Sequence, residues 1–143
     1  RRSFPLIRFN TKDLVIKGLA SCPCGRTSQK IKEVVGRMDD LRKVRGVLFS
    51  PKTVEEVIRK DFPQIEEFEI IVERRGIMDV ITLRAEPHPE LTVSSIEKTK
   101  HELQERLKIA TNLTFNVIME PPGSLPRYML KAKRFKDLRE EKP

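Results

Sequence analysis

The stretch "IEEFEIIVERRGIMDVITLRAE", residues 65–86, contains the pattern that decides the fold. Phe68, Ile70 and Val72 alternate with glutamates in its first half, which is typical of a strand with one buried face. Gly76 marks a turn, and the second half is again rich in β-branched residues. The stretch therefore predicts an antiparallel hairpin with a half-buried first strand.

A helix is predicted on each side of this hairpin. Before it, Ser50 suits an N-cap and Pro51 the first helical position, and apolar residues follow at helical spacing. After it, residues 94–110 form a second helical pattern, in which Ser94 and Glu97 are spaced as a capping box. The hairpin is therefore expected to pack against two helices.

Two further segments complete the predicted order of elements. Residues 40–50 are rich in β-branched residues around a turn at Gly46, and residues 113–120 alternate as a last strand. The order is β-α-β-β-α-β with a short hairpin ahead of it, which predicts an α+β domain of the ferredoxin-like type. Residues 1–30 hold too few apolar side chains for a core, so they are interpreted as an extension of a neighbouring domain.

Composition places the chain among globular proteins. It has 143 residues, of which 38% are hydrophobic and 35% charged. No apolar run is long enough to span a bilayer, and the basic start "RRSFPLIRF" lacks the apolar region of a signal peptide. We therefore expect a cytoplasmic protein with no membrane partner.

The net charge of +8 is unevenly distributed along the chain. Residues 1–52 carry +9 and residues 127–143 carry +4, whereas residues 53–126 carry −5. Basic segments at both ends of an acidic middle suit an anionic ligand that two segments meet together. The same pattern would also suit a nucleic acid, but it is a less specific indication of one.

Two cysteines, Cys22 and Cys24, lie in "SCPCGRT". They are too close for an unstrained disulfide, and C-x-C is half of a possible zinc site. Neither His88 nor His101 stands at a local ligand spacing, so any zinc would need ligands from outside this chain. A tight turn is the simpler interpretation.

No complete active site is visible in the sequence. Nucleophile–base spacings, paired-carboxylate motifs and phosphate-binding glycine loops are missing. Two non-enzymatic alternatives remain: a small basic nucleic-acid-binding module and an amino-acid-binding regulatory domain. Few aromatic residues are available for stacking on bases, and the RNA-recognition signatures are absent, so nucleic acid is the weaker of the possible partners.

Four motifs in one order nevertheless resemble a known family. They are "PLIRFNTKDL" (residues 5–14), "CPCGRT" (22–27), "GRMDDLRKVRGVLFSPKTVEEVI" (36–58) and "PPGSLPRYMLKAKRFKDLR" (121–139). Together they resemble the C-terminal part of the phenylacetate–coenzyme A ligases, which are adenylate-forming enzymes. The resemblance extends over nearly the whole chain.

The resemblance implies a division of the chain and an activity. Residues 1–36 would end a large N-terminal adenylation domain, which is the expected partner, and residues 37–143 would form a mobile C-terminal domain. The hinge would lie at 37–40 and the catalytic-lysine loop at 121–139. The implied enzyme uses ATP with magnesium, and coenzyme A as co-substrate, to convert an aryl-acetate-type acid into a thioester, whereas the fragment alone is expected to be inactive.

Three residues near the expected hinge acquire roles through this resemblance. Asp13 matches the residue that accepts hydrogen bonds from the ribose hydroxyls of ATP, a task that suits a carboxylate. Arg37 matches an arginine that contacts the nucleotide. Asp39 matches the residue about which the C-terminal domain rotates between the two half-reactions.

Two further positions are implied for coenzyme A and for catalysis. Arg45 and Gly46 match a loop beside the coenzyme A tunnel. Lys131 matches the lysine of the adenylation step, where an ammonium group can neutralise developing negative charge. Lys133 lies close enough in sequence to be a rival for this role.

The chain departs from the family at two glycines. Leu130 stands where the family usually has glycine before the lysine, and Lys12 stands where glycine is common in the first motif. Divergence of this kind means that the substrate is not inherited from the resemblance. The remaining basic residues of the stretch 125–139 are expected to be mainly a solvated flank.

Overall fold

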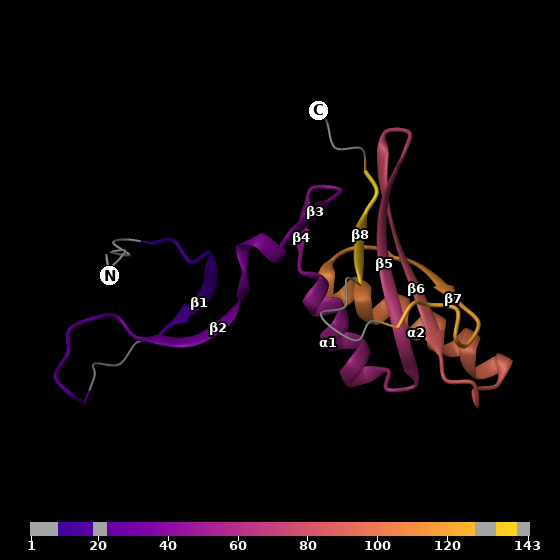
Figure 1. The fold of residues 1–143 in the computed structure, drawn as a ribbon, viewed down its shortest axis with the longest axis horizontal. Coiled ribbons are helices and arrows are strands. Elements are labelled where there is room, and N and C mark those ends of the chain that lie inside the picture. Colours follow the sequence, from indigo (N-terminus) through magenta and orange to yellow (C-terminus); the bar gives the residue numbers. More distant parts are fainter. Residues whose placement is uncertain (1–8, 19–22, 128–133, 140–143) are drawn as a thin grey trace, which may run out of the picture. The chain divides into compact units, whose positions relative to one another are not determined.

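The computed structural model describes residues 9–18, 23–127 and 134–139 (Figure 1). Contacts divide the chain into two compact units, Arg1–Leu41 and Arg42–Pro143. The boundary between them lies one residue after the residues 37–40 at which the hinge is expected.

The first unit contains a two-stranded antiparallel ribbon. Strand β1 (Asp13–Lys17) pairs with β2 (Ile31–Arg37), and the 3₁₀ turn η1 (Met38–Asp40) follows. The apolar side chains of the ribbon are exposed, Ile31 by 62% and Val34 by 58%. A ribbon of two strands cannot enclose a core by itself. That residues 1–36 end a neighbouring domain stays a prediction.

The second unit combines a four-stranded sheet, two helices and a small hairpin. The strand order in the sheet is β7-β6-β5-β8. The bounds are β3 (Arg42–Val44), β4 (Val47–Phe49), α1 (Pro51–Asp61), β5 (Ile65–Arg75), β6 (Met78–Pro87), α2 (Val93–Thr111), β7 (Asn116–Met119) and β8 (Phe135–Asp137).

The predicted hairpin forms the centre of this sheet. Strands β5 and β6 pair antiparallel from Arg75 opposite Met78 at the turn to Glu67 opposite Glu86. Gly76 takes a φ of +62°, a left-handed conformation in which glycine is favoured. The turn residue identified in the sequence therefore lies at the turn that fixes the register between β5 and β6.

The α+β class is confirmed, but the sheet takes different strands from those expected. The segment before α1 folds on itself as the hairpin β3–β4, because Arg45 and Gly46 take φ values of +49° and +81° in a two-residue turn. Strand β8 instead lies beside β5 in parallel, and β7 lies parallel to β6 after the crossover helix α2.

The helix starts are determined by hydroxyl caps. The Ser50 side chain accepts a hydrogen bond from the Lys52 amide at 3.2 Å, as predicted for α1. Helix α2 begins earlier than predicted, because Thr92 is its N-cap and accepts from the Ser95 amide at 3.4 Å. The capping box expected at Ser94 is therefore wrong by two residues.

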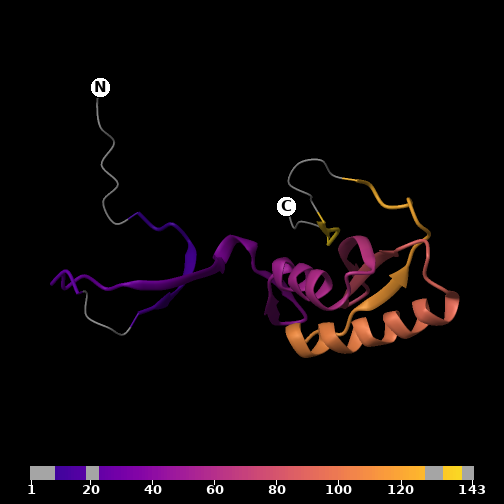
Figure 2. The ribbon, with the colours of Figure 1, turned by 90° about the horizontal axis from the view of Figure 1, so that it is seen from below.

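A single core lies between the helices and one face of the sheet. Phe68 and Ile70 of β5, Leu83 of β6, and Leu103 and Leu107 of α2 are at most 2% exposed. Figure 2 shows α2 along one side of the sheet and the segment after β7 on the opposite side. Among the described residues, no helix combines the length and the apolar character needed to cross a membrane.

Two positions of α2 provide a matched test of this core. Leu103 is fully buried, whereas Ile109 on the same helix is 76% exposed. We expect Leu103→Ala to lower the free energy of unfolding by about 2 to 5 kcal/mol because it leaves a cavity. Ile109→Ala should change it by less than about 0.5 kcal/mol. Urea unfolding of the 143-residue chain measures both, and equal losses would contradict the packing of α2.

Candidate functional site

Three of the predicted site residues lie together in the first unit. Asp13 at the start of β1 and Arg37 at the end of β2 are directly opposite each other in the ribbon. The Arg37 guanidinium donates to a carboxylate oxygen of Asp39 at 3.1 Å. Antiparallel pairing thus brings the two residues predicted to bind nucleotide next to the one predicted as the hinge.

Lys12 joins this group, although the sequence analysis singled it out only as a departure. Its backbone φ is +61°, which explains why glycine is common at this position. Its carbonyl accepts from the Met38 amide at 2.7 Å, and its ammonium lies 3.2 Å from Asp39. Hydrogen bonds from Lys12 and then Arg37 hold the pKa of Asp39 below its usual value.

The predicted coenzyme A loop, Arg45–Gly46, is the turn between β3 and β4. The Arg45 side chain donates to the carbonyl of Asp79 in β6 at 2.6 Å. Arg139 reinforces this arrangement, donating to the Lys43 carbonyl at 2.6 Å and to the Asp79 carboxylate at 3.0 Å. The turn is therefore fixed to the end of the central hairpin.

The buried glutamates on the face of the sheet opposite the core are Glu67, Glu69 and Glu86, and two of them face each other. Glu67 of β5 and Glu86 of β6 are direct partners in the register and are 7% and 0% exposed. Like charges directly opposite each other destabilise a sheet, and burial adds to the cost. The pair can stay ionised only if donors and cations surround it.

The segment after β7 supplies the donors for Glu86. Its carboxylate accepts from the backbone amides of Gly123 at 2.6 Å and Leu125 at 3.1 Å. One terminal nitrogen of Arg127 donates to Glu86 and also to Glu66, the latter at 3.0 Å. These contacts attach residues 123–127 to the sheet.

Arg134, just before β8, supplies the cation for Glu67. Its Nε and one terminal nitrogen donate to the two Glu67 oxygens at 2.6 and 3.2 Å. Its other terminal nitrogen donates to Glu55 of α1 at 3.0 Å. The guanidinium also lies over the Phe68 ring, 5.2 Å from its centroid.

These contacts correct two expectations from the sequence. Burial raises the pKa of both Glu67 and Glu86, but the hydrogen bonds outweigh it and both pKa values lie below the usual value. The sequence predicted that β5 has only one buried face. In the structure the consecutive residues Glu67 to Ile70 are all buried, so both faces of the strand are covered there. The described basic residues of the terminal segment, expected to be mainly a solvated flank, are in ion pairs with carboxylates; they are Arg127, Arg134, Lys136 and Arg139.

Four residues of the sequence analysis, Cys22, Leu130, Lys131 and Lys133, lie outside the described residues. Cys24 is described and is exposed. Within the described ranges no group of three or more histidine, cysteine or acidic side chains is arranged to hold a metal ion. Zinc binding by the two cysteines stays a prediction.

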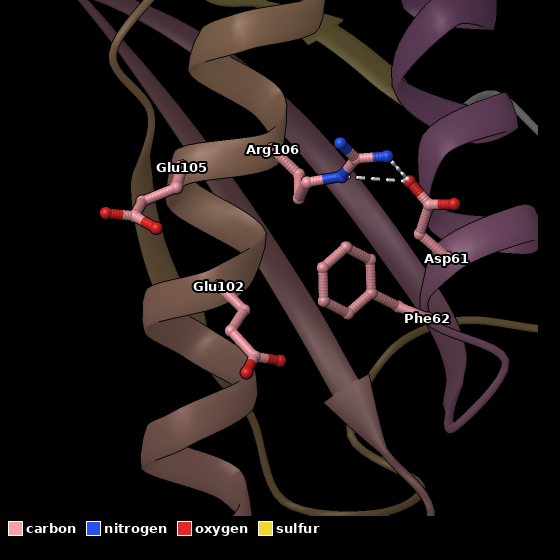
Figure 3. A pocket seen from close by; sticks show the side chains of 5 residues that line it. All are labelled: Asp61, Phe62, Glu102, Glu105 and Arg106. Carbon is pink, nitrogen blue, oxygen red and sulfur yellow. Dashed lines mark hydrogen bonds and ion pairs between the residues drawn. The ribbon is translucent and has the colours of Figure 1, made fainter.

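A hollow of about 250 Å³ lies between the end of α1 and the middle of α2 (Figure 3). The Arg106 guanidinium spans it and donates to Asp61 at 2.6 and 3.1 Å. The remaining lining residues are Phe62, Glu102 and Glu105. None of the predicted site residues contributes to it, so it is separate from the candidate site.

Comparison with known proteins defines the class. A model of the AMP-binding enzyme C-terminal domain matches residues 46–139, and the chain belongs to this family. A phenylacetate-coenzyme A ligase of Thermus thermophilus is 31% identical over 142 residues, which cover 89% of this chain and 32% of that protein. The chain therefore spans about a third of the length of the curated relatives it matches.

Solved structures agree with this assignment. A 2-hydroxyisobutyryl-CoA ligase in the postadenylation state is 26% identical, with a TM-score of 0.69 over 88% of this chain and 27% of its own. The same enzyme with 2-HIB-AMP and CoA in the thioesterification state is 27% identical, with a TM-score of 0.67 over 90% of this chain and 28% of its own. The described fold is thus that of the C-terminal part of a CoA ligase.

The buried glutamates predict how stability depends on pH. Because the folded-state pKa values of Glu67 and Glu86 are depressed, their stabilisation is present above the unfolded value of about 4.3 and is lost as the pH falls through the folded values. We expect the free energy of unfolding to fall progressively as the pH drops below about 5. In Glu86→Gln this fall should be smaller, because one of the titrating groups has been removed.

Urea unfolding of the 143-residue chain at several pH values measures this dependence. Glu90→Gln is the control, because the Glu90 side chain is 88% exposed, and it should behave as the unchanged protein does. An undiminished acid dependence in Glu86→Gln would show that Glu86 is not held ionised by its neighbours.

Proposed function

We propose that this chain is the C-terminal part of an AMP-forming ligase that joins a carboxylic acid to coenzyme A. The observation that carries the proposal is the cluster of Asp13, Arg37 and Asp39 in the first unit, of which Arg37 and Asp39 come shortly before the boundary between the two units in the sequence. A nucleotide-binding group at such a boundary suits an enzyme that rearranges its domains around a bound adenylate. The missing partner is the N-terminal adenylation domain of the same protein.

The first half-reaction is adenylation. An oxygen of the carboxylic acid attacks the α-phosphorus of ATP, a new P–O bond forms, and pyrophosphate leaves. Asp13 accepts hydrogen bonds from the ribose hydroxyls, and Arg37 contacts the nucleotide. Lys131 brings an ammonium group to the phosphate, where it offsets the negative charge that develops in the transition state.

The second half-reaction follows a rotation of the second unit about residues 37–40. The thiolate of coenzyme A attacks the acyl carbon, the C–S bond forms, and AMP leaves. The turn at Arg45 and Gly46 then lies beside the coenzyme A, and its attachment to Asp79 keeps it in shape during the movement. Aryl acetates are the substrate class that the curated relatives suggest.

The two candidate lysines can be separated in the full-length ligase. We expect Lys131→Ala to lower the rate of ATP–pyrophosphate exchange by at least about 100-fold, because charge stabilisation in the transition state is lost. Thioester formation from supplied acyl-adenylate should stay within about 3-fold, because that step does not use the lysine.

Lys133→Ala is the matched control and should retain both half-reactions. The assignment of the loop is wrong if Lys131→Ala exchanges pyrophosphate normally. Salt-dependent RNA binding by the chain, with no ligase activity in the full-length protein, would instead support the nucleic-acid alternative.

A substitution in the coenzyme A turn should impair the second half-reaction and leave the first intact, the reverse of the effect expected for Lys131→Ala. Gly46 takes a φ of +81° with open space around its Cα, so a side chain there meets backbone strain and not a clash. Gly46→Val should slow thioester formation from acyl-adenylate by about 10-fold or more, because strain of roughly 1 to 2 kcal/mol reshapes the turn. Pyrophosphate exchange should be unaffected. Equal losses in both half-reactions would remove this turn from the coenzyme A site.

A further inference from the structure

We infer that Arg127 and Arg134 are positioning residues for the adenylation half-reaction, which they serve by fixing the chain on both sides of residues 128–133. This inference rests on the proposed function, because Lys131 belongs to that interval. The two arginines and their glutamates are all described residues, and neither arginine was assigned a role from the sequence.

The first attachment point is built around a fully buried carboxylate. Glu86 is 0% exposed and binds the backbone of Gly123 and Leu125 as well as Arg127. Leu125 is itself 3% exposed, so the chain is held by apolar burial and by charge at the same place. The path of the chain up to residue 127 is therefore set by the sheet.

The second attachment point is the Arg134 guanidinium. Three of its nitrogens donate to carboxylate oxygens, two to Glu67 and one to Glu55. The Arg134 carbonyl also accepts from the Ile70 amide at 2.6 Å, which starts the pairing of β8 with β5. The start of the stretch 134–139 is thus placed by both the sheet and α1.

The two attachment points share one electrostatic cause. Glu67 and Glu86 are direct partners across β5 and β6, and each takes its arginine from a different side of the interval 128–133. Two negative charges directly opposite each other in a sheet repel, so each glutamate is stabilised by its own arginine. Since the two glutamates are neighbours, Arg127 and Arg134 are held at adjacent places on the sheet. Residues 127 and 134, on either side of Lys131 in the sequence, are thus both attached to the sheet.

The geometry distinguishes the two arginines chemically. Arg127 reaches Glu66 and Glu86 through a single nitrogen, a contact that the ammonium of a lysine can also make. Arg134 uses three nitrogens in a fork that a lysine cannot reproduce. Arg127→Lys should therefore keep function, whereas Arg134→Lys should behave like Arg134→Met.

The test measures both half-reactions in the full-length ligase carrying Arg127→Met, Arg134→Met, the two lysine variants or Lys131→Ala. We expect the two methionine variants and Arg134→Lys to slow pyrophosphate exchange by about 10- to 100-fold through misplacement of the reacting group. Their thioester formation from acyl-adenylate should stay within about 3-fold, which also shows that they are folded. In Arg127→Lys, the rates of both half-reactions should stay within about 3-fold of those of the unchanged enzyme.

Arg106→Met is the matched control, because it removes an arginine–carboxylate pair from the same unit away from this segment. It should leave both half-reactions within about 3-fold of the unchanged enzyme. Suppose that Lys131→Ala abolishes pyrophosphate exchange. If the arginine variants then slow both half-reactions equally, or slow neither of them, the positioning role is overturned and the proposed function stands. If Lys131→Ala leaves exchange intact, the proposed function fails and the inference fails with it.

Discussion

Two buried carboxylates that face each other across the central hairpin organise the second unit. Glu67 and Glu86 are direct partners on the face of the sheet opposite the core, with at most 7% of either residue exposed. Without cations one of them would have to take up a proton, because like charges at this spacing in a poorly hydrated place repel strongly. Gly123, Leu125 and Arg127 supply two backbone amides and a cation to Glu86, and Arg134 supplies the cation for Glu67. The placement of residues 123–127 and 134–139 therefore depends on this pair.

The same pair explains the uneven charge of the chain. The acidic middle and the basic end, which by composition alone could indicate an external anion, meet within the molecule. The paired arginines are thereby used in the structure and are not displayed as a basic surface. This weakens the charge argument for nucleic-acid binding and agrees with the membership of the AMP-binding enzyme C-terminal domain family.

Much of the fold could be predicted from the sequence, and the limits have physical causes. Period-two alternation and Gly76 identified the hairpin, and Ser50 with Pro51 identified the start of α1, because these are local signals. Strand β8 was missed because three residues carry too little pattern, and its place beside β5 is set by Arg134 and Phe135 contacts that are distant in sequence. Among the site residues, Asp13, Arg37 and Asp39 came from motif resemblance, whereas Lys12 could have been found only from its left-handed backbone.

Both opposing carboxylates are held ionised by the amides of Gly123 and Leu125 and by Arg127 and Arg134. The most direct measurement is a carboxyl ¹³C NMR titration of Glu67 and Glu86 in the 143-residue chain. The structure predicts that both midpoints lie below the value of about 4.3 that is usual for a glutamate in water. A midpoint above that value for either residue would show that the pair shares a proton, and would contradict the account.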